Sequence, residues 1–163
     1  MTALPMMSFG EAVKTCFKKY VDFSGRARRS EYWWFQVLHL ILSACTTAIF
    51  IWKITAGDKL KAQVGEAIFD QEKMDAIMAQ ANTIDNTFYL LVGLVCIIWL
   101  ALVLPGLAVT VRRLHDIGKS GWYILLGIIP YVNFIGCIVL FVFSVMDSKP
   151  EENKFGPSPK YIG

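Results

Sequence analysis

The chain has 163 residues, of which 55% are hydrophobic and 18% are charged, and its net charge is +3 at pH 7. Soluble domains are about 45–50% apolar and about 25% charged. The composition excludes intrinsic disorder, because disordered chains are poor in apolar residues and rich in charge. The 4 cysteines lie far apart without a CxxC pair, so we expect neither a disulfide scaffold nor a cysteine metal site.

Charged residues are absent from three long stretches of the chain, which are residues 32–52, 88–111 and 121–146. About 20 apolar residues in a helix are enough to cross a bilayer core of about 30 Å. The sequence therefore predicts an all-α, polytopic membrane protein with three long hydrophobic runs. A chain of this length is expected to form a single membrane domain over residues 1–163.

The segment before the first run predicts a short amphipathic helix over residues 8–20. Ser8 and Glu11 have the spacing of a capping box. Apolar residues then recur at helical spacing, with lysines on the other side. Two interpretations stay open: a helix lying in the membrane interface, or one packed on its own protein. Tyr32, Trp33 and Trp34, which open the first run, are typical of an interfacial aromatic belt.

The connections and the third run complete the expected layout. Residues 53–87 are polar with helical periodicity, which predicts an external helical connection broken near Asp70. In the third run, Pro130 stands among glycines, so a break near residues 129–133 is expected. Two short helices would then form a bent hairpin, for a total of three to four membrane helices. The proline-containing tail, residues 147–163, is expected to be irregular.

Lysine and arginine counts predict the orientation in the membrane, since cytoplasmic loops carry an excess of both. Residues 1–31 contain 6 of them, and the short loop 112–120 contains 3. Residues 53–87 contain 4, against 6 acids. We therefore expect the N-terminus and loop 112–120 to be cytoplasmic and residues 53–87 to be outside. A hairpin in the third run would place the tail inside, and a single span would place it outside.

Two motifs with catalytic associations lack the residues that their chemistry requires. His115 and Asp116 begin an HDIG string found in metal-dependent phosphohydrolases, but the only other histidine, His39, lies inside the first run. A metal site needs three or four protein ligands, so no metal and no cofactor are expected. The GKS string ending at Ser120 lacks the first glycine of a P-loop, because Arg113 occupies that position. His39 itself is expected to be a structural residue.

The arginines that border the membrane runs are the strongest functional signal. Guanidinium groups bind phosphates through paired donors, and basic clusters at the membrane surface attract anionic lipids. A role in membrane topology alone is the simpler interpretation of such residues. The acidic residues among these arginines favour a further role. Ion pairs such as Arg29–Asp116 or Arg112–Glu31 would hold together the ends of the membrane helices on this side. The candidate residues for binding lipid or a partner are Arg26, Arg28, Arg29, Glu31, Arg112, Arg113, His115, Asp116 and Asn153.

Three strings, GRARRSEYWWF from residue 25, RRLHDIGKSGWY from residue 112 and ENKFGPSP from residue 152, occur in this order. Together they resemble the DUF805 family of bacterial inner-membrane proteins, over residues 17–159. The resemblance implies a multi-pass protein of the bacterial inner membrane and supplies no activity. Residues 53–87 look like an insertion relative to shorter members. If the three strings form one site, they share a face, which favours a cytoplasmic tail.

Two functions from different classes are consistent with these observations. The first is a non-enzymatic helical bundle that binds anionic lipid headgroups, a membrane-protein partner or a second copy of itself through a cytoplasmic arginine-rich rim. The alternative is a membrane enzyme or transporter acting on a lipid or small amphiphile, with His115 and Asp116 at the membrane surface. Nucleic-acid binding is not expected, because the net charge is small and the basic residues flank membrane helices.

Overall fold

The computed structural model describes residues 2–162 and is almost entirely helical, as the sequence predicts. The chain divides into two compact units. The first unit contains both ends of the chain, up to Leu38 and from Ala101, and the second comprises His39–Leu100. The second unit consists of the C-terminal part of α2 (Arg29–Ala67) and the N-terminal part of α3 (Gln71–Asp116), which form a helical hairpin.

Helix α1 (Phe9–Lys18) begins with the predicted capping box. The amide of Ser8 donates to the Glu11 carboxylate at 2.8 Å, and the amide of Glu11 donates to the Ser8 hydroxyl at 3.4 Å. Ala12 and Cys16 are fully buried on the inner face of the helix, so this face packs on the protein itself. Phe17 contacts Phe35 of α2 edge to face, and yet it remains 44% exposed. The helix is therefore packed on one side and apolar on part of its exposed side.

Helices α2 and α3 are the only two helices within residues 2–162 that are long and apolar enough to cross a membrane. They have 39 and 46 residues, or about 58 and about 69 Å at about 1.5 Å per residue. Both are longer than a bilayer core of about 30 Å. The structure thus has two helices of spanning length, where the sequence predicts three to four membrane helices.

Residues 53–87 do not form separate helices, because α2 continues to Ala67 and α3 begins at Gln71. The segment just after residue 52 contains no proline and many good helix formers, so α2 continues past the end of the uncharged run. A short turn at residues 68–70 joins the two helices. The Asp70 carboxylate accepts from the amide of Lys73 at 3.2 Å, which is the contact of a helix N-cap.

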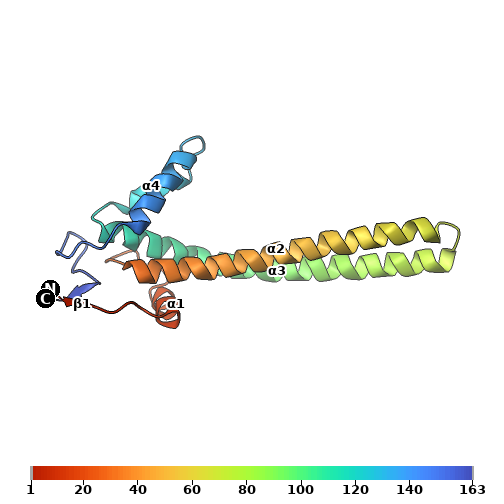
Figure 1. The fold of residues 1–163 in the computed structure, drawn as a ribbon, viewed down its shortest axis with the longest axis horizontal. Helices are drawn as coiled ribbons and strands as arrows, with labels where there is room; N and C mark the ends of the chain where they lie inside the picture. The colour runs from red at the N-terminus through yellow and green to blue at the C-terminus, as the bar shows by residue number, and fades with distance from the viewer. Residues whose placement is uncertain (1, 163) are drawn as a thin grey trace. The chain divides into compact units, whose positions relative to one another are not determined.

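The second unit is an antiparallel pair of helices that lie side by side (Figure 1). An ion pair joins Lys53 to Asp85, and the ring of Phe50 meets that of Phe88 edge to face at 5.3 Å. His39 stacks on Trp99 with ring centroids 5.6 Å apart, which is consistent with a structural role. In this unit aromatic contacts and one ion pair hold the two helices together.

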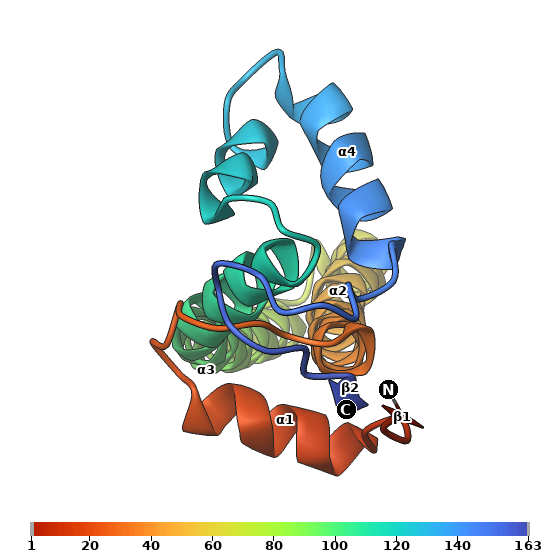
Figure 2. The same ribbon diagram turned by 90° about the vertical axis from the view of Figure 1, so that its left-hand side faces the viewer.

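The third hydrophobic run does not form one helix. A 3₁₀ helix, η1 (Gly121–Gly127), is followed by an irregular segment and then by α4 (Asn133–Val145). Tyr131 in that segment has a φ of 67°, the left-handed region that non-glycine residues rarely adopt. η1 and α4 pack against each other (Figure 2). A Cβ added at Gly136 would lie 2.0 Å from the Leu126 carbonyl oxygen, so their close approach requires glycine there.

The two ends of the chain meet in the first unit (Figures 1 and 2). Strand β1 (Thr2–Ala3) pairs antiparallel with β2 (Tyr161–Ile162). The amide of Leu4 extends this pairing by donating to the Lys160 carbonyl at 2.8 Å. The tail is otherwise irregular apart from a bridge between Asn153 and Gly156. The N-terminal segment and the tail therefore lie next to each other.

Candidate functional site

The three polar strings converge in the first unit, where Arg26 connects them. Its Nε donates to the Asp116 carboxylate at 3.0 Å, and Nη2 donates to the main-chain carbonyl of Asp116 at 3.2 Å. Nη1 donates to the carbonyls of Glu151 and Gly156 at 2.9 and 3.2 Å, and Nη2 also donates to the Lys149 carbonyl. Arg26 thus joins the segment before α2 to the end of α3 and to the tail.

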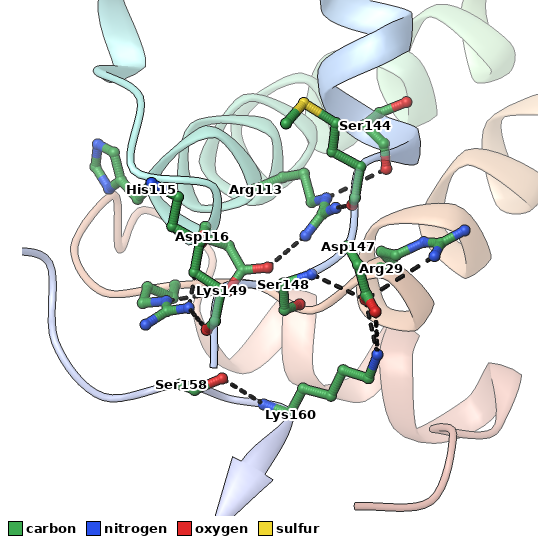
Figure 3. A network of polar contacts seen from close by, with 12 residues as sticks. Arg29, Arg113, His115, Asp116, Ser144, Asp147, Ser148, Lys149, Ser158 and Lys160 are labelled. Atoms are coloured by element: carbon green, nitrogen blue, oxygen red, sulfur yellow. Dashed lines mark hydrogen bonds and ion pairs between the residues drawn. The ribbon is translucent and has the colours of Figure 1, made fainter. Parts of the chain in front are cut away.

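Asp116 binds a second guanidinium on its other oxygen. Arg113 donates from Nη1 to Oδ2 of Asp116 (Figure 3), while Arg26 is held on Oδ1. The remaining donors of Arg113 reach the end of α4, since Nε lies 3.3 Å from the Ser144 carbonyl and Nη2 donates to the Met146 carbonyl. A cation at these carbonyls also complements the negative end of the helix dipole. Asp116 and Arg113 together attach α4 to α3.

Arg112 forms the third buried pair. Its Nη2 lies 3.1 Å from Oε1 of Glu31, within ion-pair distance, but the geometry is not that of a hydrogen bond. Its Nε donates to the Ala108 carbonyl one turn earlier in α3 at 3.3 Å. The main chain adds a further link, because the amide of Ala27 donates to the Arg112 carbonyl at 2.9 Å. The Arg112–Glu31 pair, which the sequence suggests, is therefore present.

We name these five residues, Arg26, Glu31, Arg112, Arg113 and Asp116, the arginine cluster. All five side chains are buried, with residue exposures between 0% and 5%. Their guanidinium groups are directed at partners within the chain, so Arg26, Arg112 and Arg113 are not exposed for lipid headgroups. Removing one partner from a buried ion pair leaves an uncompensated charge, which is strongly destabilising. The arginine cluster thus joins the start of α2, the end of α3, the end of α4 and the tail to one another.

The pairing of Arg29 with Asp116 is wrong. Arg29 is about half exposed, and its Nη1 lies 3.9 Å from the carboxylate of Asp147 at the start of the tail (Figure 3). Asp147 also accepts from Nζ of Lys160 at 2.6 and 2.7 Å. The hydrogen bond from Lys160 is the main reason why the pKa of Asp147 lies below its usual value, and Asp147 in turn raises the pKa of Lys160. Both groups are therefore charged at neutral pH.

His115 and Asn153 occupy the edge of the arginine cluster and link α3 to the tail. Nδ1 of His115 lies 3.2 Å from the Gly25 carbonyl, and its ring stacks on Phe155 at 3.7 Å between centroids. The Asn153 amide donates to the His115 carbonyl at 3.0 Å. Gly25 has a φ of 74°, which favours glycine at this turn. His115 is therefore packed and hydrogen bonded on the side that faces the tail.

Two groups with acid–base or nucleophilic chemistry, Asp116 and Cys16, are buried. Asp116 is fully buried and binds two guanidinium groups, so it offers no free oxygen to a substrate. Burial also raises the pKa of the Cys16 thiol to about 12, which keeps this thiol protonated. Among residues 2–162, no group of three or more His, Cys, Asp or Glu side chains is placed to hold a metal ion.

Sequence reasoning missed the acceptors from the tail. Three of the main-chain carbonyls that accept from Arg26 belong to the tail, those of Lys149, Glu151 and Gly156. Any residue type supplies a carbonyl, so the sequence carries no signal for them. Asp147 and Lys160 were missed as well, although a charged residue directly after a hydrophobic run is a visible signal.

Comparison with known proteins identifies the family. The model of the family described as "Protein of unknown function (DUF805)" matches residues 20–157. The "Inner membrane protein YhaH" of Escherichia coli strain K12 is 34% identical over 146 residues, which cover 88% of this chain and 91% of that protein. The "Inner membrane protein YhaI" of the same strain is 33% identical over 144 residues, with the same coverage. No solved structure matches. The chain therefore belongs to the DUF805 family and is a membrane protein.

Proposed function

We propose that the protein is a non-enzymatic helical bundle of the bacterial inner membrane that binds anionic lipid at its cytoplasmic face. The observation that carries the proposal is a division among the arginines. Arg26, Arg112 and Arg113 are buried in the arginine cluster, whereas Arg28 is half-buried and Arg29 is exposed at the start of α2. Both cations lie close in the sequence to Trp33 and Trp34, and tryptophans are typical of the level at which lipid headgroups meet the membrane interface. Each such cation contributes about 1 kcal/mol of attraction to an anionic membrane.

For the topology, we propose that the N-terminus and the tail both lie in the cytoplasm, with α2 and α3 as the crossings. The contacts of Arg26 with the tail support this proposal, as does the pairing of β1 with β2, since hydrogen-bonded segments lie on the same side. The η1–α4 segment then enters the membrane and returns on the side from which it came. At 13 residues, α4 is about 20 Å long, which is shorter than the bilayer core.

Reporter fusions test this topology. We expect a reporter that is active only outside the cytoplasm to be active when inserted at Asp70 and inactive when fused after Gly163. A reporter that is active only in the cytoplasm should give the reverse pattern and serves as the control. An active periplasmic reporter after Gly163 would contradict the re-entrant η1–α4 segment.

Mass spectrometry of protein released gently from native membranes tests the lipid function. We expect the wild-type protein to carry anionic lipid. The double variant Arg28→Gln/Arg29→Gln should carry at least fivefold less, because it loses the two cations of the exposed rim. The control Lys14→Gln/Lys18→Gln removes the same charge from the exposed side of α1 and should retain the lipid. Equal lipid retention by the two double variants would contradict the proposal. A bound protein in place of lipid would favour the partner-binding alternative.

A further inference from the structure

A cavity of about 480 Å³ lies in the first unit, between the N-terminal segment, the start of α2 and the tail. Its size falls within the range of about 300–1,000 Å³ that is common for small-molecule sites. One part of its wall is apolar and consists of Leu4, Met6, Trp33, Trp34 and Val37. The cavity is separate from the arginine cluster, because none of the five cluster residues lines it.

Hydrogen bonds fix the three segments that form the wall. Nε1 of Trp34 donates to the Met7 carbonyl at 2.9 Å, and Nη2 of Arg28 donates to the Leu4 carbonyl at 3.2 Å. The Leu4 amide donates to the Lys160 carbonyl in the tail, as described above. The cavity is therefore built by specific contacts among sequence-distant residues.

The polar part of the wall carries an excess of positive charge. Arg28, Arg29 and Lys160 line it together with a single carboxylate, that of Asp147. Asp147 is shared between Lys160 and the more distant Arg29, and the side chain of Arg28 donates to main-chain carbonyls. The positive end of the α2 dipole adds to this field, since Arg29 is the first residue of the helix. A phosphate matches such a set of donors, because guanidinium groups pair with its oxygens.

We propose that this cavity holds one anionic phospholipid, with its phosphate on the cationic wall and one acyl chain against Trp33, Trp34 and Val37. The inference rests on the proposed function and makes it specific to one site. A phospholipid is favoured over a soluble anion because the same cavity is lined by both cationic and apolar side chains. Its position also favours lipid, since residues from the first turns of the first uncharged run line it, including tryptophans typical of the interface.

Quenching of tryptophan fluorescence by brominated lipid tests the position of the acyl chain. The protein is reconstituted into phosphatidylcholine vesicles that contain either chain-brominated phosphatidylglycerol or chain-brominated phosphatidylcholine at the same mole fraction. Only Trp33 and Trp34 are kept, because the other tryptophans are replaced by phenylalanine: Trp52, Trp99 and Trp122. We expect at least twofold stronger quenching by the brominated phosphatidylglycerol.

Two variants in this background test separately the contribution of the cationic side chains and that of the volume open to the acyl chain. Arg29→Gln/Lys160→Gln removes two cations from the wall, leaves the Arg28 hydrogen bonds in place and should abolish the excess quenching. Val37→Phe keeps every charge but adds volume to the apolar part of the wall, so it should also reduce the excess at least twofold. The control Lys14→Gln/Lys18→Gln loses the same charge outside the cavity and should keep the excess.

The outcomes distinguish lipid binding in this cavity from lipid binding by the protein in general. Equal quenching by the two brominated lipids, in a protein that still carries anionic lipid by mass spectrometry, would overturn the cavity and leave the proposed function standing. An excess that survives Val37→Phe would likewise place the acyl chain elsewhere. Equal quenching together with no retained anionic lipid would overturn both.

Discussion

Replacing Asp116 with asparagine is expected to lower the free energy of unfolding by about 3–5 kcal/mol, the cost of breaking a buried ion pair. Asp116 is fully buried and neutralises two guanidinium groups, those of Arg26 and Arg113. Asparagine keeps the shape but removes the negative charge, so both cations lose their carboxylate inside the protein. Denaturant unfolding of the purified protein in micelles, followed by circular dichroism, measures the change.

The matched control for this variant is Asp147→Asn. Asp147 also pairs with two cations, but its side chain is 49% exposed, and exposed ion pairs contribute about 0–1 kcal/mol. We expect the control to change stability by less than about 1 kcal/mol. Equal effects of the two substitutions would contradict the structural role assigned to Asp116.

Glu31→Gln is the second substitution with a large expected effect. It leaves the Arg112 guanidinium, which is fully buried, without its carboxylate, and we again expect a loss of about 3–5 kcal/mol. The double variant Glu31→Met/Arg112→Met removes both charges together. It should recover most of the lost stability, because apolar side chains of similar volume replace buried ion pairs at little or no cost.

Unfolding of the two variants in the same micelles checks this second prediction. An exposed pair provides the control, since Asp58→Asn breaks the contact of Asp58 with Lys61 on α2 and should have an effect below about 1 kcal/mol. A double variant that is no more stable than Glu31→Gln would show that the loss arises from packing and not from the unpaired charge.

The helical membrane class was predictable because it depends on long-range composition. Runs without charge and of bilayer length require a helix whatever the tertiary structure, since main-chain groups in lipid must be satisfied within the chain. The extent of α2 and α3 was not predictable in the same way. The polarity of residues 53–87 marks the end of the apolar run, but it does not end a helix that lacks a stop signal.

The ion pairs were predictable only in part. Arg112 and Glu31 both lie in the first or last turns of long helices, so their proximity follows from the pairing of the helix ends. The partner of Asp116 depends on the path of the loop at Gly25, whose φ of 74° turns the chain so that Arg26 reaches Asp116. No local pattern in the sequence determines that path. The tail carbonyls around Arg26 depend on it as well.

The division of the arginines into buried and exposed sets is the central claim, and one mass-spectrometric comparison tests it most directly. Asp116→Asn and Arg28→Gln/Arg29→Gln are released from native membranes side by side, under conditions in which both remain folded. We expect Asp116→Asn to keep the wild-type amount of anionic lipid and the arginine double variant to lose it at least fivefold. Loss of lipid from Asp116→Asn, with retention by Arg28→Gln/Arg29→Gln, would contradict the division.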